Sequence, residues 1–275
     1  MTVKDKILQG RTYLGIELGS TRIKAVLIDD SFSVIASGSK QWENRFENGC
    51  WTYSLDDIHG GIQACYKDLA ENVKAQYGIY PETYGAMGIS AMMHGYMAFD
   101  KNDKLLVPFR TWRNTMTAQA AGELTKLLGF NIPQRWSIAH LYQAVLNKES
   151  HVPYIAYINT LAGYVHKRLT DRFEVGVGEA SGIFPVEGIG YKKEYCEPTE
   201  KSLAEKGFDH KLKDILPAVR NAGEKGAVLT EEGARFLDPE GRLKAGVPVC
   251  PPEGDAGTGM VATDSVLKKT GNISA

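Results

Sequence analysis

A short segment near the C-terminal end of the sequence holds a carboxylate in surroundings that could make it a base. Residues 247–249 predict a buried strand, and the turn that follows brings Asp255 to the start of a predicted helix that opens with Ala256-Gly257-Thr258. At such a position backbone N–H groups point outward and the helix dipole favours negative charge, so the aspartate should be ionised and able to accept a proton. The neighbouring glycines would leave room for a ligand. The alternative is an N-cap residue that only satisfies the amides of its own helix.

A second segment, close to the N-terminus, could hold phosphate and metal. A carboxylate, a glycine turn, two hydroxyls and two cations fall within eight residues, Glu17-Leu18-Gly19-Ser20-Thr21-Arg22-Ile23-Lys24. Exposed N–H groups and hydroxyls of a tight turn can bind phosphate oxygens, and a carboxylate beside them can bind Mg²⁺ through water. The segment is not a Walker A loop, because GxxxxGK[ST] is absent. Gly-Ser-Thr is also ordinary hairpin-turn composition, so a purely structural turn stays open as the alternative.

Alternating strands and helices must position these residues. The pattern predicts strands at 13–18, 23–28 and 33–39, a helix at 55–77 that ends at Gly78, a strand at 84–90, helices at 117–128, 138–148 and 160–169, and a short helix at 198–206 within a polar, turn-rich stretch. The strand at 84–90 would deliver Met92-Met93-His94-Gly95 to its C-terminal edge. Three meandering strands followed by helix–strand units predict an α/β fold whose ligand site lies at the C-terminal ends of the strands.

Composition excludes several classes of function. The chain has 275 residues, 32 basic and 33 acidic, and a net charge of −1. This balance argues against nucleic acid or an anionic membrane surface as the main partner. Its four cysteines are far apart and form no CxxC pair, which is typical of reduced thiols in a cytoplasmic protein. The first nine residues lack the apolar core of a signal peptide, and no stretch is long and apolar enough to span a bilayer.

Five motifs occur in the order and at the spacing of the FGGY carbohydrate kinases, and they are Glu17-Leu18-Gly19-Ser20-Thr21, Met92-Met93-His94-Gly95, Trp112-Arg113-Asn114, Ala180-Ser181-Gly182 and Gly254-Asp255-Ala256-Gly257. The sequence resembles this family from about Tyr13 to its end, and most of all xylulokinases and their pentulose- and hexulose-kinase relatives. The resemblance implies the ribonuclease H-like fold of the actin/Hsp70/sugar-kinase type, with a mixed central sheet flanked by helices. Residues 1–10 would be an extension and 11–275 the first, sugar-binding domain. The second, ATP-binding domain would be absent from this chain.

The resemblance also implies a role for each motif. Asp255 would be the catalytic base that takes the proton from a sugar hydroxyl. Met93 and His94 would line the sugar pocket, and Trp112 and Arg113 would flank the substrate. A structural histidine beside a glycine turn and a core tryptophan are the alternatives for His94 and Trp112.

For the nucleotide, the family implies that Gly19, Ser20, Thr21 and Lys24 bind the phosphates of ATP and that Glu17 binds Mg²⁺. The segment Arg135-Trp136 with His140 is a further candidate, although a solvated arginine and a core tryptophan are the default interpretation.

The sequence departs from the family pattern at several of these positions. Glu17 stands where an aspartate is usual, which moves the carboxylate by about one C–C bond, and Lys24 stands where an arginine is common. Ala256 replaces the asparagine that follows the base in xylulokinases. Asn114 stands where an aspartate is common, and Trp51-Thr52-Tyr53-Ser54 lacks a carboxylate. These differences predict a sugar pocket unlike that for D-xylulose.

These observations predict an ATP- and Mg²⁺-dependent ketose kinase of the cytoplasm, of which this chain is the sugar-binding half and is inactive by itself. Its partners would be a small ketose and the missing C-terminal kinase domain, with neither nucleic acid nor membrane. The resemblance is also compatible with a homodimer of the full-length protein. The alternatives are a sugar-binding or regulatory domain without catalysis and an actin-like ATPase of another type.

Overall fold

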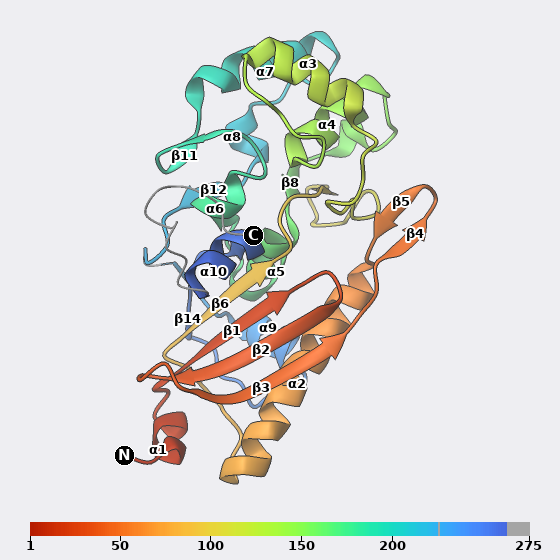
Figure 1. Cartoon of the computed structure of the whole chain (residues 1–275). Helices are drawn as coiled ribbons and strands as arrows, with labels where there is room; N and C mark the ends of the chain where they lie inside the picture. Colours follow the sequence, from red (N-terminus) through yellow and green to blue (C-terminus); the bar gives the residue numbers. More distant parts are fainter. Residues whose placement is uncertain (225, 263–275) are drawn as a thin grey trace.

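A seven-stranded mixed β-sheet forms the centre of the computed structural model, which describes residues 1–224 and 226–262 (Figure 1). The strands follow the order β13-β14-β6-β1-β2-β3, and β15 also pairs with β6. Their bounds are β1 (Thr12–Leu18), β2 (Arg22–Asp29), β3 (Val34–Gln41), β6 (Ala86–Ala91), β13 (Ala227–Val228), β14 (Pro248–Val249) and β15 (Glu253–Gly254). The α/β class with a mixed central sheet is confirmed.

The pairing of the strands brings three chain segments to one edge of the sheet. β1 and β2 are antiparallel, as are β2 and β3, which are the predicted hairpins. β1, β14 and β15 all run parallel to β6. In register, Leu18 pairs with Ala91, and Ala91 pairs with Gly254. The C-terminal ends of β1, β6 and β15 are therefore direct neighbours.

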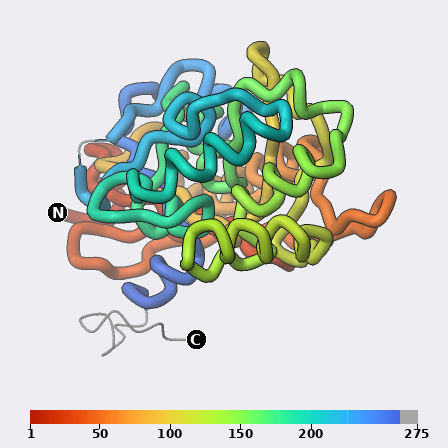
Figure 2. The backbone as a smooth tube through the Cα atoms, turned by 90° about the horizontal axis from the view of Figure 1, so that it is seen from above, coloured from red at the N-terminus to blue at the C-terminus, as the bar shows by residue number. Residues whose placement is uncertain are grey.

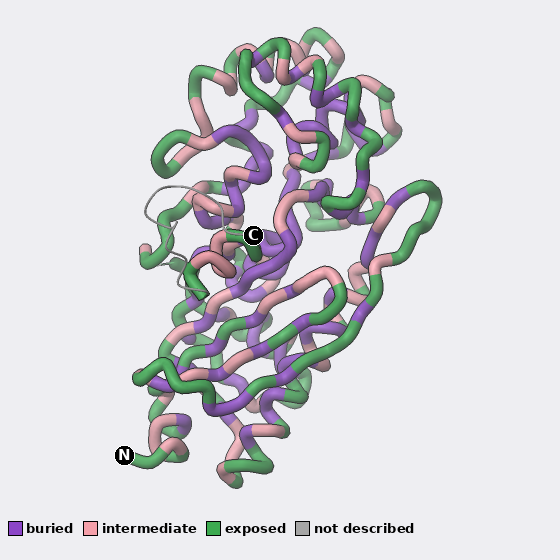
Figure 3. The backbone as a smooth tube through the Cα atoms, viewed as in Figure 1, coloured by how far each residue is buried: buried purple, intermediate pink, exposed green. Residues whose placement is uncertain are grey.

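Strict alternation along β1 and β2 determines which face of the sheet is covered. The apolar side chains of one face are buried against α2 (Leu55–Tyr77), α5 (Leu161–Thr170) and α9 (Glu231–Leu237). Helix α2 begins at a capping box in which Ser54 and Asp57 bind each other's backbone, and it ends at Gly78 with φ 75°. In Figure 3 buried and exposed residues alternate along these strands. The face that α2 leaves open carries Tyr13, Gly15 and Glu17.

A second, mainly helical core lies above the sheet in Figure 1. Its elements are α3 (Ala118–Leu128), α4 (Ser137–Leu146), the 3₁₀ turn η1 (Val152–Tyr154), α6 (Val177–Ala180), α7 (Lys193–Glu205) and α8 (Leu212–Ile215). Three short strand pairs lie outside the central sheet. They are β7 (Met97–Phe99) with β8 (Tyr157–Asn159), β9 (Glu174–Gly176) with β12 (Ala218–Arg220), and β10 (Val186–Glu187) with β11 (Gly190–Tyr191).

The structure differs from the sequence prediction in two local elements. Helix α7 begins at Lys193 and contains Pro198, so the predicted start at Pro198 is wrong. That prediction placed the proline in the first turn, where its missing N–H costs nothing, whereas the helix tolerates it one turn further in. Residues 1–10, expected as an extension, include helix α1 (Val3–Leu8), whose Ile7 is 1% exposed in the sheet core.

A hairpin of β4 (Arg45–Glu47) and β5 (Cys50–Thr52) projects from the body of the molecule beside the segment that carries Trp112 (Figure 2). The Thr111 N–H donates to the Trp51 carbonyl at 3.2 Å and ties the two segments together. Within the described part of the chain, no helix has the length and apolar character needed to cross a bilayer.

Candidate active site

The turn between β1 and β2 is held through its carbonyl groups. Trp42 Nε1 donates to the Gly19 carbonyl at 2.7 Å, and the Tyr53 hydroxyl donates to the Ser20 carbonyl at 2.6 Å. The two aromatic rings stack with their centroids 4.1 Å apart. Because two carbonyls of the turn are bound from one side by a packed aromatic pair, the turn has a defined conformation, and Thr21 in it is exposed.

Glu17 and Lys24 lie directly opposite each other on β1 and β2. Glu17 Oε1 is 3.9 Å from Lys24 Nζ, and the two side chains are 43% and 57% exposed. An ion pair this open to solvent contributes little to stability. Both groups are therefore accessible on the uncovered face of the sheet.

Asp255 and Met93 meet where β15 and β6 end. The Met93 N–H donates to Asp255 Oδ1 at 3.3 Å, and Asp255 is exposed. Asp255 is the first residue of α10 (Asp255–Ala262), whose predicted start lies one residue later, at Ala256. Its carboxylate binds the amide of a neighbouring segment because parallel pairing of β6 and β15 brings Met93 beside it.

The glycines around Asp255 differ in the space they leave. A Cβ on Gly254 would lie 2.1 Å from Met93 Cγ, so the space expected there for a ligand is filled by the protein itself. A Cβ on Gly257 would have no heavy atom within 4 Å, which agrees with the expected room. Gly254 thus permits close packing beneath Asp255, and Gly257 leaves the helix surface open.

His94 occupies a strained turn directly after Met93. Its φ is 69° and that of Gly95 is 89°, and the Gly95 N–H donates to the Arg135 carbonyl at 3.2 Å. The ring packs on Gly182, where a Cβ would lie 2.6 Å from His94 Nδ1. Burial of the ring and the charge of Arg135 lower the pKa of His94 to about 4. The imidazole is therefore neutral at pH 7.

Trp112 and Arg113 turn in different directions. Trp112 is 39% exposed, which is not a core position, and its Nε1 donates to Ser20 Oγ at 3.3 Å. The Arg113 guanidinium lies 3.9 Å from the ring centroid of Trp51 in the projecting hairpin. Asn114 is buried and exchanges two hydrogen bonds of 2.9 Å with the Trp51 backbone. Its amide has a structural role, because an aspartate could not donate the second bond.

In addition to the ion pair of Glu17 with Lys24, hydrogen bonds join four of the predicted residues in two pairs, Met93 with Asp255 and Ser20 with Trp112. Sheet register places both pairs at the same edge. No hydrogen bond within residues 1–224 and 226–262 links one pair to the other, and Arg113 is engaged by Trp51.

Several supporting residues escaped the sequence prediction. Trp42 and Tyr53 hold the turn but come from separate segments without a recognisable pattern. Glu179 and Glu253 lie beneath Asp255, and their only sequence signal is that each adjoins a predicted motif. The Glu179 N–H donates to Glu253 Oε2 at 3.0 Å. Burial raises the pKa of Glu253, although hydrogen bonds from backbone amides lower it in part.

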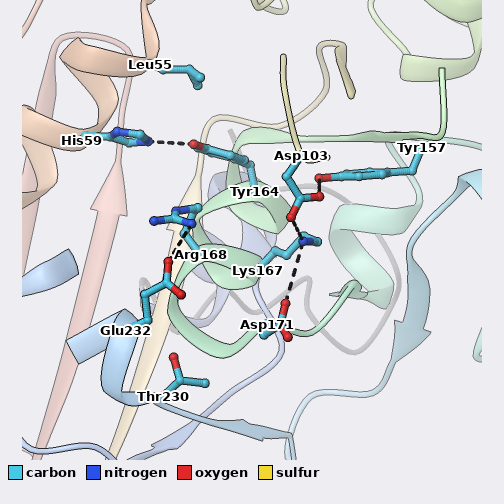
Figure 4. A pocket seen from close by; sticks show the side chains of 10 residues that line it. All are labelled: Leu55, His59, Asp103, Tyr157, Tyr164, Lys167, Arg168, Asp171, Thr230 and Glu232. Carbon is cyan, nitrogen blue, oxygen red and sulfur yellow. Dashed lines mark hydrogen bonds and ion pairs between the residues drawn. The ribbon is translucent and has the colours of Figure 1, made fainter. Parts of the chain in front are cut away.

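Two of the cavities contain charged or polar side chains, and neither is lined by Met93, Asp255, Ser20 or Trp112. The first, of about 530 Å³, lies between α2, α5 and α9, and its charged groups already bind one another (Figure 4), as in Lys167 with Asp103 and Arg168 with Glu232. The second, of about 400 Å³, lies on the open face of the sheet and is lined by Glu17, Ser90 and Thr258 among others. Glu17 thus lines a cavity. No described group of three or more acidic, histidine or cysteine side chains forms a ready metal site.

His140, the further candidate, is a core residue. It is 0% exposed, neither ring nitrogen has a hydrogen-bond partner among the described atoms, and its ring lies 6.0 Å from that of Tyr96. Arg135 is exposed and Trp136 is half-buried against the second core. These positions fit the default interpretation of this segment.

The stability of the chain should fall as the pH falls from 6.5 towards 3. Burial and the charge of Arg110 lower the pKa of His140 to about 3, so between these values the unfolded chain binds a proton that the folded chain excludes. His140→Leu should reduce the loss of unfolding free energy over this range, as measured by urea unfolding at several pH values. The same loss in both proteins would contradict the assignment.

Comparison with known proteins identifies the relationship. Residues 12–262 match the N-terminal domain of the FGGY family of carbohydrate kinases, which is most of the chain. The chain belongs to the FGGY family. This FGGY domain is 24% identical over 239 residues to a xylulose kinase of Haemophilus influenzae, covering 82% of this chain and 47% of that protein. It is 23% identical over 124 residues to a xylulose kinase of Lactococcus lactis, covering 42% of this chain and 23% of that protein.

Solved structures show the same fold. A xylulose kinase from Lactobacillus acidophilus has a TM-score of 0.69 at 17% identity, covering 92% of the FGGY domain and 50% of that chain. A kinase from Brucella ovis, described as a xyloylose kinase, has a TM-score of 0.68 at 21% identity, covering 89% of the FGGY domain and 49% of that chain. Glycerol kinase of Plasmodium falciparum with ADP has a TM-score of 0.69 at 14% identity. The ribonuclease H-like fold of sugar kinases is confirmed, and the chain spans about half the length of these relatives.

Proposed function

We propose that this chain is the sugar-binding half of an ATP-dependent ketose kinase, with Asp255 as the base. The observation that carries the proposal is the exposed carboxylate of Asp255, bound by the Met93 amide at the edge where β1, β6 and β15 end. In α/β folds this edge is where ligands bind. A carboxylate held by one backbone bond and otherwise open to solvent is free to accept a hydroxyl proton.

The role of the base is mainly to orient the sugar hydroxyl towards the phosphoryl group. Phosphoryl transfer depends chiefly on positioning and charge stabilisation, and a placed base contributes about 10²–10⁴-fold. The Met93 amide bond restricts where the carboxylate can lie, and the packing of Met93 on Gly254 restrains the backbone. Asp255 would then take the proton as the hydroxyl oxygen attacks the γ-phosphorus of ATP, and the bond from that phosphorus to the bridging oxygen breaks to release ADP.

The turn at Gly19, Ser20 and Thr21 would receive the ATP phosphates. The carbonyls of Gly19 and Ser20 are bound by Trp42 and Tyr53. These two carbonyl oxygens therefore need not face an incoming phosphate. Lys24 has a weak, solvent-exposed partner that phosphate could replace.

Mg²⁺ fits this arrangement as an ion carried by the nucleotide, because such ions need only one or two carboxylates in addition to phosphate oxygens. Glu17 is an exposed carboxylate that lines a cavity beside the turn, and it would hold the ion. When bound, Mg²⁺ neutralises phosphate charge. The chain's own contribution is to place Glu17 and Lys24 opposite each other on adjacent strands.

A sugar would contact the edge through His94 and Trp112. A neutral imidazole can both donate to and accept from hydroxyls, and the lowered pKa of His94 keeps it neutral. The half-exposed Trp112 offers an apolar face to the carbon chain of a sugar. Arg113 would reach substrate only by leaving Trp51. We leave the identity of the ketose open, because Ala256 removes one amide that xylulokinase-like sequences place beside the base.

A non-catalytic sugar-binding or regulatory domain is the second candidate. The reason to keep it is that the groups proposed to bind phosphate form one wall, whereas tight nucleotide binding needs a second wall. An actin-like ATPase of another type is disfavoured by the family match.

The purified 275-residue chain should show no ketose-dependent ADP formation at the roughly 1–100 s⁻¹ of ordinary kinases. A full-length protein that contains it should phosphorylate one or more members of a ketose panel with Mg-ATP. A coupled ADP assay on both proteins tests this. Normal turnover by the chain alone would contradict the half-enzyme proposal, and a full-length protein that binds ketoses without turnover would favour the regulatory alternative.

A further inference from the structure

A buried carboxyl group without a partner lies beneath the proposed base. Glu179, in the short helix α6, is 0% exposed. Neither of its carboxyl oxygens has a hydrogen-bond partner in the described part of the structure. Burying an ionised carboxylate in this way is far costlier than burying a neutral acid. The geometry alone therefore favours a protonated Glu179.

The location of this carboxyl group connects it to Asp255. A Cβ on Gly254 would lie 2.8 Å from Glu179 Oε2, so the carboxyl packs directly against the residue that joins Glu253 to Asp255. The backbone N–H of Glu179 is already used by Glu253. Helix α6 thus binds Glu253 through its backbone and packs the Glu179 side chain against Gly254, the residue before Asp255.

The groups around Glu179 oppose its ionisation on balance. Burial raises its pKa to about 8, and the charges of Glu253 and Asp255 act in the same direction. The nearby Thr160 hydroxyl at the start of α5 acts in the opposite direction, although its geometry falls short of a hydrogen bond to either carboxyl oxygen. The buried Tyr191 hydroxyl of β11, whose pKa Glu179 helps to raise, has no hydrogen-bond partner among the described residues, and no cation contributes to the shift of Glu179.

We infer that Glu179 is a positioning residue that stays protonated beneath Asp255 and so leaves Asp255 as the ionised, proton-accepting member of the acidic segment. This inference rests on the proposed role of Asp255. A second negative charge beside Gly254 would favour the protonated form of the base and would strain the packing at Gly254. In many enzymes two neighbouring carboxyl groups have environments that push their pKa values apart. One group then stays protonated while the other is ionised.

The first test is a ¹³C NMR titration of the side-chain carboxyl groups in the 275-residue chain. Glu179 should titrate near 8 rather than at the ordinary value of 4.5. The Asp255 signal should shift a second time as Glu179 loses its proton, and Glu179→Gln should abolish this second step. A merely structural Glu179 would not move the Asp255 signal in this way. Titration of Glu179 near 4.5, or an Asp255 signal without the second step, would overturn the inference.

The second test compares stability with pH. Between 4.5 and about 8 the folded chain holds a proton on Glu179 that the unfolded chain releases, so stability falls as the pH rises through this range. Glu179→Gln mimics the neutral acid and does not lose stability in this way. The melting temperature of the variant minus that of the parent should therefore increase by about 3 °C or more from pH 5 to pH 8. Glu187→Gln, at an exposed position of β10, is the matched control and should run parallel to the parent. Parallel curves for Glu179→Gln would also overturn the inference.

Neither test requires turnover. If the full-length protein proved not to be a kinase, the two measurements would still report whether Glu179 is protonated and coupled to Asp255. Failure of the inference and failure of the proposed function therefore give different results.

Discussion

Replacing Asp255 with asparagine should lower the turnover of the proposed full-length kinase by about 10²-fold or more while sugar binding is largely kept. The amide of asparagine cannot accept the hydroxyl proton, so the variant has no base for the phosphoryl-transfer step. The asparagine oxygen can still accept the Met93 N–H, which now donates to Asp255 Oδ1 at 3.3 Å. Folding should therefore change by well under about 1 kcal/mol.

Steady-state kinetics beside thermal melts distinguish catalysis from stability. Asp255→Ala should lose both the base and the Met93 bond, so it should be the less stable variant. Asp171→Asn, an 89% exposed aspartate at the end of α5, is the matched control and should leave turnover unchanged. Near-normal turnover of Asp255→Asn would return Asp255 to a structural role at the start of α10.

Replacing Gly38 with alanine should reduce the unfolding free energy of the chain by about 3 kcal/mol. Gly38 lies in β3 where α2 crosses the sheet. A Cβ there would lie 2.4 Å from the Leu69 backbone nitrogen and 2.5 Å from the Cys65 carbonyl oxygen. These are backbone atoms and cannot rotate away, so the strand and the helix would have to separate.

Gly15→Ala is the matched control for this effect. Gly15 is also a strand glycine of the same sheet, but it faces the uncovered side, and a Cβ there would have no heavy atom within 4 Å. Alanine at this position should be neutral or stabilise the chain by up to about 1 kcal/mol, because it restricts the unfolded state. Urea unfolding of both variants measures the difference. Equal stability of the two variants would show that α2 does not pack on β3 as described.

The local elements of this protein follow from its sequence. Two-residue alternation in β1 and β2, the helical spacing of apolar residues in α2, and Gly78 as its stop are each encoded within a few neighbouring residues. The order of these elements determines the α/β class. Motif spacing identifies the family and the edge at which Asp255, His94 and Trp112 lie, because parallel strands end together.

The hydrogen-bond partners and packing contacts of those residues depend on the tertiary structure alone. Trp42 and Tyr53 hold the turn between β1 and β2 from later segments of the chain, and Glu179 reaches Gly254 from a different part of the sequence. The partner of Asp255 is the Met93 amide rather than its own helix, because strand register brings β6 beside β15. Burial and partnership depend on contacts between distant segments, and local periodicity carries no information about which segments will meet.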